Sequence, residues 1–142
     1  MSSSFSDGLE VRISQLRRRD RRYARNSYYF ILDTLDYTIE TLGRDRLTGA
    51  SRHVGGKEML AGVRELAAEQ FGPMATVVLE RWGIRTTEDV GEVVFNLIEN
   101  GLLSRRPSDS RLDFADGFDF ERAFDKKFSE RIAEISEIEI LG

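Results

Sequence analysis

Apolar residues spaced three and four positions apart recur along most of this 142-residue chain, a pattern typical of amphipathic helices. A first stripe predicts a short helix near the N-terminus and consists of Phe5, Leu9, Ile13 and Leu16. A longer stripe predicts a second helix, capped by Asp20 and ended by Gly43. Its apolar positions are Tyr28, Ile31, Leu32, Leu35, Ile39 and Leu42. Residues 44–54 mix charged and small residues, so we predict a loop there.

Three further helices are expected after that loop. Gly55 and Glu58 have the spacing of a capping box, although glycine has no side-chain oxygen to complete it. A glycine–proline pair at 72–73 ends one helix and begins the next, and Thr86 or Thr87 caps the last one. The apolar positions of the three helices are, in order, Leu60, Val63, Leu66, Ala67 and Phe71; Met74, Val77, Val78 and Trp82; Val90, Val93, Val94, Leu97 and Ile98.

The last third of the chain contains strand-like segments. Residues 102–106 and 111–114 are predicted to be two short strands around a turn at 107–110, and residues 118–128 a short helix. The predicted fold class is therefore mainly α with a small β-hairpin. A helix, a turn, a second helix and a hairpin follow one another in the order of a winged helix, so we expect a winged-helix-like α+β segment.

A winged helix would bind DNA through its second helix, and charge tests that interpretation. Between residues 87 and 100 there are Glu88, Asp89, Glu92 and Glu99, with no lysine or arginine. Phosphates would repel such a helix, so we reject reading of the major groove by this element.

Length and composition predict one domain over residues 1–142, with residues 1–8 flexible and residues 129–142 forming a C-terminal arm. The absence of cysteine excludes disulfides, thiolate zinc sites and cysteine nucleophiles. The N-terminal residues lack the basic start and apolar run of a signal peptide, and no apolar stretch is long enough to cross a bilayer. We therefore expect a cytoplasmic protein without a membrane partner.

The most unusual feature of the sequence is a run of arginines. Six arginines and one aspartate between positions 17 and 25 carry a local charge of +5, in a chain of net charge −4. One interpretation is contact with a phosphate backbone or an acidic protein, with Tyr23 available to stack. The other is a solvated segment that pairs with the chain's own acids, in residues 109–125 or in the tail. The candidate interaction residues in this run are Arg17, Arg18, Arg19, Arg21, Arg22 and Arg25.

His53, the only histidine, is the one candidate for a general base. It would need a nucleophile and an orienting acid, and only Ser51 and Asp45 lie close to it in sequence. We favour a loop imidazole that fixes the approach to the third helix. No catalytic, cofactor-binding or metal-ligating residue is assigned, because the aspartates of residues 109–119 lack the spacing of a calcium loop and the glycines at 55–56 lack the lysine of a phosphate-binding loop.

Several strings of sequence occur together, namely residues 52–56, 71–75, 78–84, 89–97, 101–103 and 113–114. In this combination the chain resembles, from about Tyr23 to Phe128, an uncharacterised bacterial family found mainly in Planctomycetes and Verrucomicrobia. It departs from that family at Gly55, where a serine N-cap is expected. The resemblance implies no activity, cofactor or site residue, because the function of the family is unknown.

The tail alternates isoleucine with glutamate and is too apolar to remain without a partner. It is expected to dock on its own domain or to pair with another chain, including a second copy, by strand addition. Its candidate interaction residues are Ile138, Ile140 and Leu141. Taken together, the sequence favours a non-enzymatic protein-interaction or adaptor module. The alternative is a nucleic-acid-associated protein that binds the phosphate backbone through Arg17–Arg25.

Overall fold

The protein is mainly helical. The computed structural model describes residues 2–3 and 8–125. Its α-helices are α1 (Leu9–Arg19), α2 (Arg25–Thr41), α3 (Gly56–Phe71), α4 (Ala75–Arg81) and α5 (Thr87–Glu99), and residues 120–125 are helical as well. The 3-10 helices are η1 (Gly49–Arg52), η2 (Gly72–Met74) and η3 (Arg111–Phe114). The five helices expected before residue 101 are therefore confirmed.

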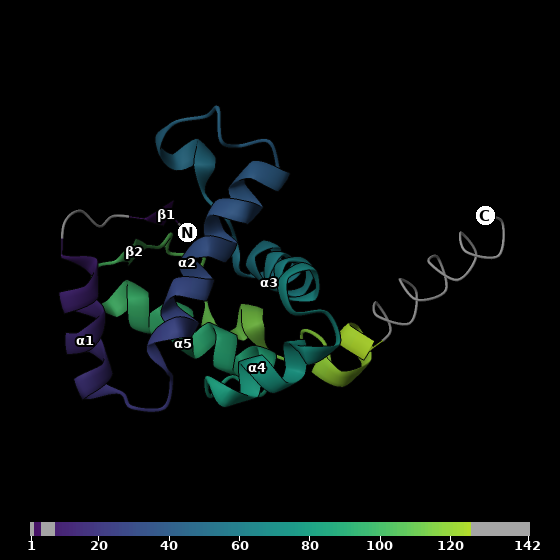
Figure 1. Cartoon of the computed structure of the whole chain (residues 1–142). Coiled ribbons are helices and arrows are strands. Elements are labelled where there is room, and N and C mark those ends of the chain that lie inside the picture. The colour runs from purple at the N-terminus through teal and green to yellow at the C-terminus, as the bar shows by residue number, and fades with distance from the viewer. Residues whose placement is uncertain (1, 4–7, 126–142) are drawn as a thin grey trace, which may run out of the picture.

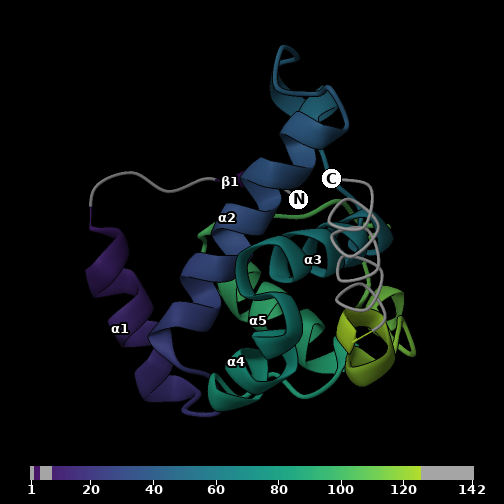
Figure 2. The same ribbon diagram turned by 45° about the vertical axis from the view of Figure 1, so that its right-hand side comes forward.

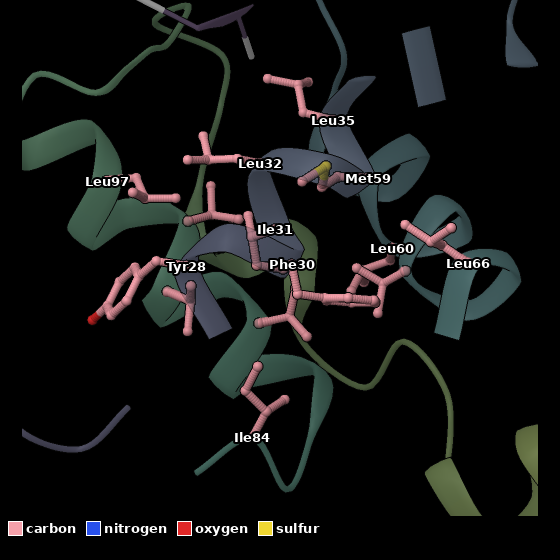
Figure 3. Packing of buried hydrophobic residues seen from close by; sticks show 14 of the residues in the cluster. Tyr28, Phe30, Ile31, Leu32, Leu35, Met59, Leu60, Leu66, Ile84 and Leu97 are labelled. Atoms are coloured by element: carbon pink, nitrogen blue, oxygen red, sulfur yellow. The ribbon is translucent and has the colours of Figure 1, made fainter. Parts of the chain in front are cut away.

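Helix α2 is the central element of the fold, and it packs against α1, α3 and α5 (Figures 1 and 2). Its apolar face is fully buried at Tyr28, Ile31 and Leu35. In Figure 3 the side chains of α2 lie in the middle of the core, with Met59 of α3 on one side and Leu97 of α5 on the other. Burial of this apolar face of α2 therefore holds α1, α3 and α5 around it.

Helices α2 and α3 approach closely at Gly62. A Cβ atom at this position would overlap Oγ1 of Thr38, which donates a hydrogen bond of 2.7 Å to the carbonyl oxygen of Thr34. The neighbouring Thr34 hydroxyl donates in turn to the carbonyl oxygen of Phe30. Both threonine hydroxyls are therefore satisfied within α2, and α3 can lie directly against them.

The predicted hairpin between residues 102 and 114 is wrong in its second strand. Strand β2 (Leu103–Ser104) pairs antiparallel with β1 (Ser2–Ser3), while residues 111–114 form η3. The physical reason is local capping, since the Ser110 hydroxyl accepts from the backbone N–H of Leu112 and the Asp113 carboxylate accepts from that of Ser110.

Helix η3 also places Phe114 in the core. The Phe114 ring is fully buried and stands edge-on to Phe95, with ring centroids 6.4 Å apart. A Cβ at Gly56 or Gly91 would collide with Phe114 or its neighbour, so both glycines leave room for this segment. Tertiary burial of one aromatic residue outweighs the strand-like spacing of residues 111–114.

Two other expectations need correction. Asp20 closes α1 and does not cap α2, which begins after Ala24. Met74 and Val77, expected on the buried face of their helix, are 54% and 53% exposed. The α4 helix has only seven residues, so it buries little beyond Ala75 and Leu79.

Candidate functional site

The arginine run lies at the end of α1 and in the turn to α2, and much of it makes contacts within the chain. The Arg22 guanidinium bonds Asp20 at 2.7 Å and reaches Glu92 of α5 at 3.3 Å. Arg17 donates to the carbonyl oxygen of Tyr23, and Arg25 to the Ser14 hydroxyl. The side chains of Arg17 and Arg25 therefore help to shape the turn.

The remaining arginines of the run differ in their surroundings. Arg19 donates to the side-chain oxygen of Asn100 at 3.3 Å. Arg18 and Arg21 are exposed, and neither makes a hydrogen bond or ion pair within residues 8–125. Tyr23 is not available to stack on a base, because it is 1% exposed and donates a 2.6 Å hydrogen bond to Asp89. Burial and the nearby carboxylate raise the pKa of the Tyr23 phenol.

A second candidate surface is the loop between α2 and α3, which projects from one end of the molecule (Figures 1 and 2). It contains η1 and two glycines with positive φ, Gly43 at 70° and Gly49 at 60°. Leu42 and Leu47 are 42% and 44% exposed. We call Leu42, Arg46 and Leu47 the loop surface. Two leucines exposed on one projecting loop present apolar surface that a partner protein can cover.

Three tethers hold this loop at its base. Arg44 makes a bidentate pair with Glu58, with N–O distances of 2.9 and 3.0 Å, and also donates to the carbonyl oxygen of His53 at 2.8 Å. Glu58 Oε1 accepts from the backbone N–H of Gly55 as well, so the expected half of a capping box is confirmed. The paired guanidinium lowers the pKa of the Glu58 carboxyl. The loop is therefore fixed to the start of α3.

The second tether is a buried pair of His53 and Asp109. Nε2 of His53 lies 3.2 and 3.1 Å from the two carboxylate oxygens, and the side chains are 10% and 6% exposed. Burial, the larger effect, lowers the pKa of His53 although Asp109 alone would raise it. A lowered pKa favours the neutral imidazole at pH 7, and a neutral ring that bonds the Asp109 carboxylate through Nε2 carries its proton on that nitrogen. The acid that orients His53 is Asp109 and not Asp45.

The third tether comes from the turn after β2. The Arg106 guanidinium donates to the carbonyl oxygen of Ala50 in η1, and the backbone N–H of Arg106 donates to Asp109 at 2.8 Å. Asp109 therefore joins the turn to the loop. The sequence could not reveal this arrangement, because His53 and Asp109 lie 56 residues apart and belong to separate irregular segments.

A polar pocket of about 360 Å³ opens between the loop and the turn. It is lined by Arg44, Ser51, His53, Gly55, Glu58, Arg106, Ser108 and Asp109. Its walls offer hydroxyl and guanidinium donors beside acids that already have partners. Such a pocket can hold a small polar group, and it offers few apolar atoms to a larger ligand.

The aspartates of residues 109–119 serve local structure. Asp113 caps η3, and Asp119 accepts from the backbone N–H of Arg122 at the start of the helix at 120–125. Within residues 8–125 no group of three or more His, Asp or Glu side chains is placed to hold a metal ion. No helix in the same part of the chain combines the length and apolarity that a bilayer span requires. The tail candidates Ile138, Ile140 and Leu141 lie outside the described residues.

Comparison of the chain with protein-family models, with curated proteins and with solved structures gave no match. The resemblance to a planctomycete and verrucomicrobial family therefore stays a prediction.

Proposed function

We propose that the protein is a non-enzymatic interaction module that binds an acidic partner protein through the loop surface. The observation that carries the proposal is the exposure of Leu42 and Leu47 on a loop whose base has three tethers. A partner protein binds more tightly to apolar side chains that are already held in position, because little conformational entropy is lost on binding.

Charge supports an acidic partner. Residues 42–58 and 105–109 contain six basic and three acidic side chains, a net charge of +3, whereas the whole chain carries −4. These two segments are therefore basic in an acidic chain. Complementary charge speeds association and selects the partner, while the leucines add apolar contact area.

The winged-helix-like order of α4, turn and α5 stays a prediction. We do not propose that α5 reads DNA. The acids of α5 are occupied, because Asp89 accepts from Tyr23, and Glu92 and Glu99 pair with Arg111 at 3.6 and 2.8 Å. An acidic α5 surface does not fit a phosphate backbone.

The test compares two exposed leucines. Leu47→Asp removes the apolar contact of the loop surface, and Leu112→Asp is the matched control because Leu112 is 80% exposed on η3. The tagged protein and both variants are used to capture proteins from the organism that encodes the chain, with and without nuclease. A partner held by the parent and by Leu112→Asp but lost from Leu47→Asp supports the proposal. A partner that all three chains retain contradicts it.

The second candidate function is binding of nucleic acid by charge, and it is favoured by the exposure of Arg18 and Arg21. Its test is the salt dependence of RNA and DNA binding, with Arg18→Ala/Arg21→Ala as the variant. Each lost phosphate contact should reduce the slope of log affinity against log salt by roughly one. Binding that is absent or independent of salt rules this candidate out.

A further inference from the structure

The polar pocket between the loop and the turn after β2 is lined by one exposed arginine that suits an anionic ligand. The Arg106 guanidinium is exposed, and its partner within residues 8–125 is the carbonyl oxygen of Ala50, which carries no formal charge. A guanidinium presents five N–H donors in one plane, so this single bond leaves most of them available. Ser51 and Ser108 line the same pocket, and a serine hydroxyl can donate one hydrogen bond.

The two acids of the pocket already accept hydrogen bonds from the protein. Glu58 accepts two bonds from Arg44 and one from Gly55. Asp109 accepts from the backbone N–H of Arg106 and lies within bonding distance of His53 Nε2. Their charges are directed into these bonds, which reduces their repulsion of an incoming anion.

We infer that this pocket binds a single carboxylate group of the partner protein, with Arg106, Ser51 and Ser108 as donors. The inference rests on the proposed function, because it names the group through which the acidic partner enters the site. A planar carboxylate can accept two parallel N–H bonds from one guanidinium, and this geometry gives direction as well as affinity.

The charges of the pocket favour a monoanion over a phosphate dianion. Arg44 and Arg106 balance Glu58 and Asp109, and His53 is neutral at pH 7, so the formal sum is zero. One added negative charge can be offset when His53 takes up a proton, whereas a second one cannot. Binding of a carboxylate should therefore raise the pKa of His53, by the reciprocity of linked equilibria.

The experiment uses His53 as its own reporter. As the only histidine in the chain, it gives a single set of imidazole NMR signals. The full chain is titrated with sodium acetate at constant ionic strength, with sodium chloride as the reference salt. We expect a saturable change in the His53 signals and an upward shift of the His53 pKa with acetate. Sodium chloride should produce neither effect.

Two variants localise the binding, and one serves as a control. Arg106→Gln should abolish saturable acetate binding, and Ser108→Ala should weaken it several-fold while leaving the loop tethers intact. Arg105→Gln is matched to Arg106→Gln in charge and sequence position, but Arg105 lies over the Phe95 ring and does not line the pocket. It should bind acetate as the parent does.

Three results would overturn the inference. They are a linear response to acetate that sodium chloride reproduces, equal loss of binding in both arginine variants, and tighter binding of inorganic phosphate than of acetate. None of them bears on the loop surface, because the Leu47→Asp capture experiment does not involve Arg106. A failed titration beside a successful capture experiment therefore rejects the carboxylate site and keeps the interaction module.

Discussion

Nε2 of His53 lies 3.1 Å from Oδ2 of Asp109, and this buried pair links the loop after α2 to the turn after β2. Neither segment is regular, and the pair adds to the two other tethers of the loop, Arg44–Glu58 and Arg106–Ala50. The pair therefore fixes the base of the loop surface. Loss of the His53–Asp109 pair should make the loop less ordered and leave the helical core around α2 folded.

Replacing Asp109 tests the strength of that link. Asp109→Ala leaves both the His53 ring and the Arg106 N–H without their acceptor, so we expect unfolding to become easier by about 1–3 kcal/mol in a urea titration. Asp45→Ala is the control, because Asp45 is exposed on the same loop, and it should change stability by less than about 0.5 kcal/mol. Equal effects of the two variants would contradict the role of the pair.

Stability should fall on mild acidification. The pKa of His53 is lower in the folded protein than its ordinary value of 6.5, so the unfolded chain binds the proton more readily. Stability is therefore full above pH 6.5 and falls as the pH drops below it toward the folded pKa. The measurement is the midpoint of urea unfolding at several pH values between pH 7 and pH 5. In His53→Gln this part of the pH dependence should disappear, and its persistence would assign the effect to another group.

The close approach of α2 and α3 should not tolerate a methyl group. Gly62→Ala places a Cβ against the Thr38 hydroxyl, and separation of the helices should cost roughly 1–3 kcal/mol in thermal or urea unfolding. Ala61→Ser on the exposed side of α3 provides the control and should be nearly neutral. An unchanged or raised stability of Gly62→Ala would show that the steric cost does not exceed the helix propensity gained, about 1 kcal/mol, and would contradict the close approach.

The contact between Tyr23 and Asp89 anchors the arginine-rich turn to α5. Tyr23→Phe removes the donor of the 2.6 Å bond and should lower the free energy of unfolding by about 1 kcal/mol. Tyr37→Phe, a half-buried tyrosine of α2, should have a smaller effect. If the two variants are indistinguishable, the turn is not held by this bond.

The C-terminal arm can be tested by truncation. A chain that ends at Phe128 lacks Ile138, Ile140 and Leu141, and the proposal places the partner on the loop surface. The truncated chain should therefore capture the same partner as the full chain in the same experiment. Loss of that partner would move the interaction to the arm.

Local sequence signals predicted the helices well. The stripe from Tyr28 to Ile39 and the capping threonine Thr86 are short-range features, and both are confirmed. Leu42, the last apolar position expected in that stripe, lies after α2 and is exposed. The signal failed at residues 111–114, where spacing suggested a strand but Ser110 caps a 3-10 helix and Phe114 enters the core. Local propensity is weak in such short segments, and burial decides their conformation.

The contacts of the candidate site could not be predicted from local sequence patterns. The sequence showed a lone histidine near Ser51 and Asp45, and the fold supplied Asp109 from a distant turn. The arginine run was predicted to be a candidate interaction surface because of its dense positive charge. In the structure Arg17, Arg22 and Arg25 make hydrogen bonds or ion pairs within the chain. Pairing between remote irregular segments depends on the whole fold, and no periodicity in the sequence encodes it.

The most direct test of the loop surface is site-specific crosslinking. The chain has no cysteine, so Leu47→Cys and Leu112→Cys can each carry one photoreactive maleimide at a defined position. The proposal predicts that the probe at residue 47 crosslinks to the partner captured by the parent chain and that the probe at residue 112 does not. Crosslinking to that partner from residue 112 alone, or from neither position, would contradict binding through the loop surface.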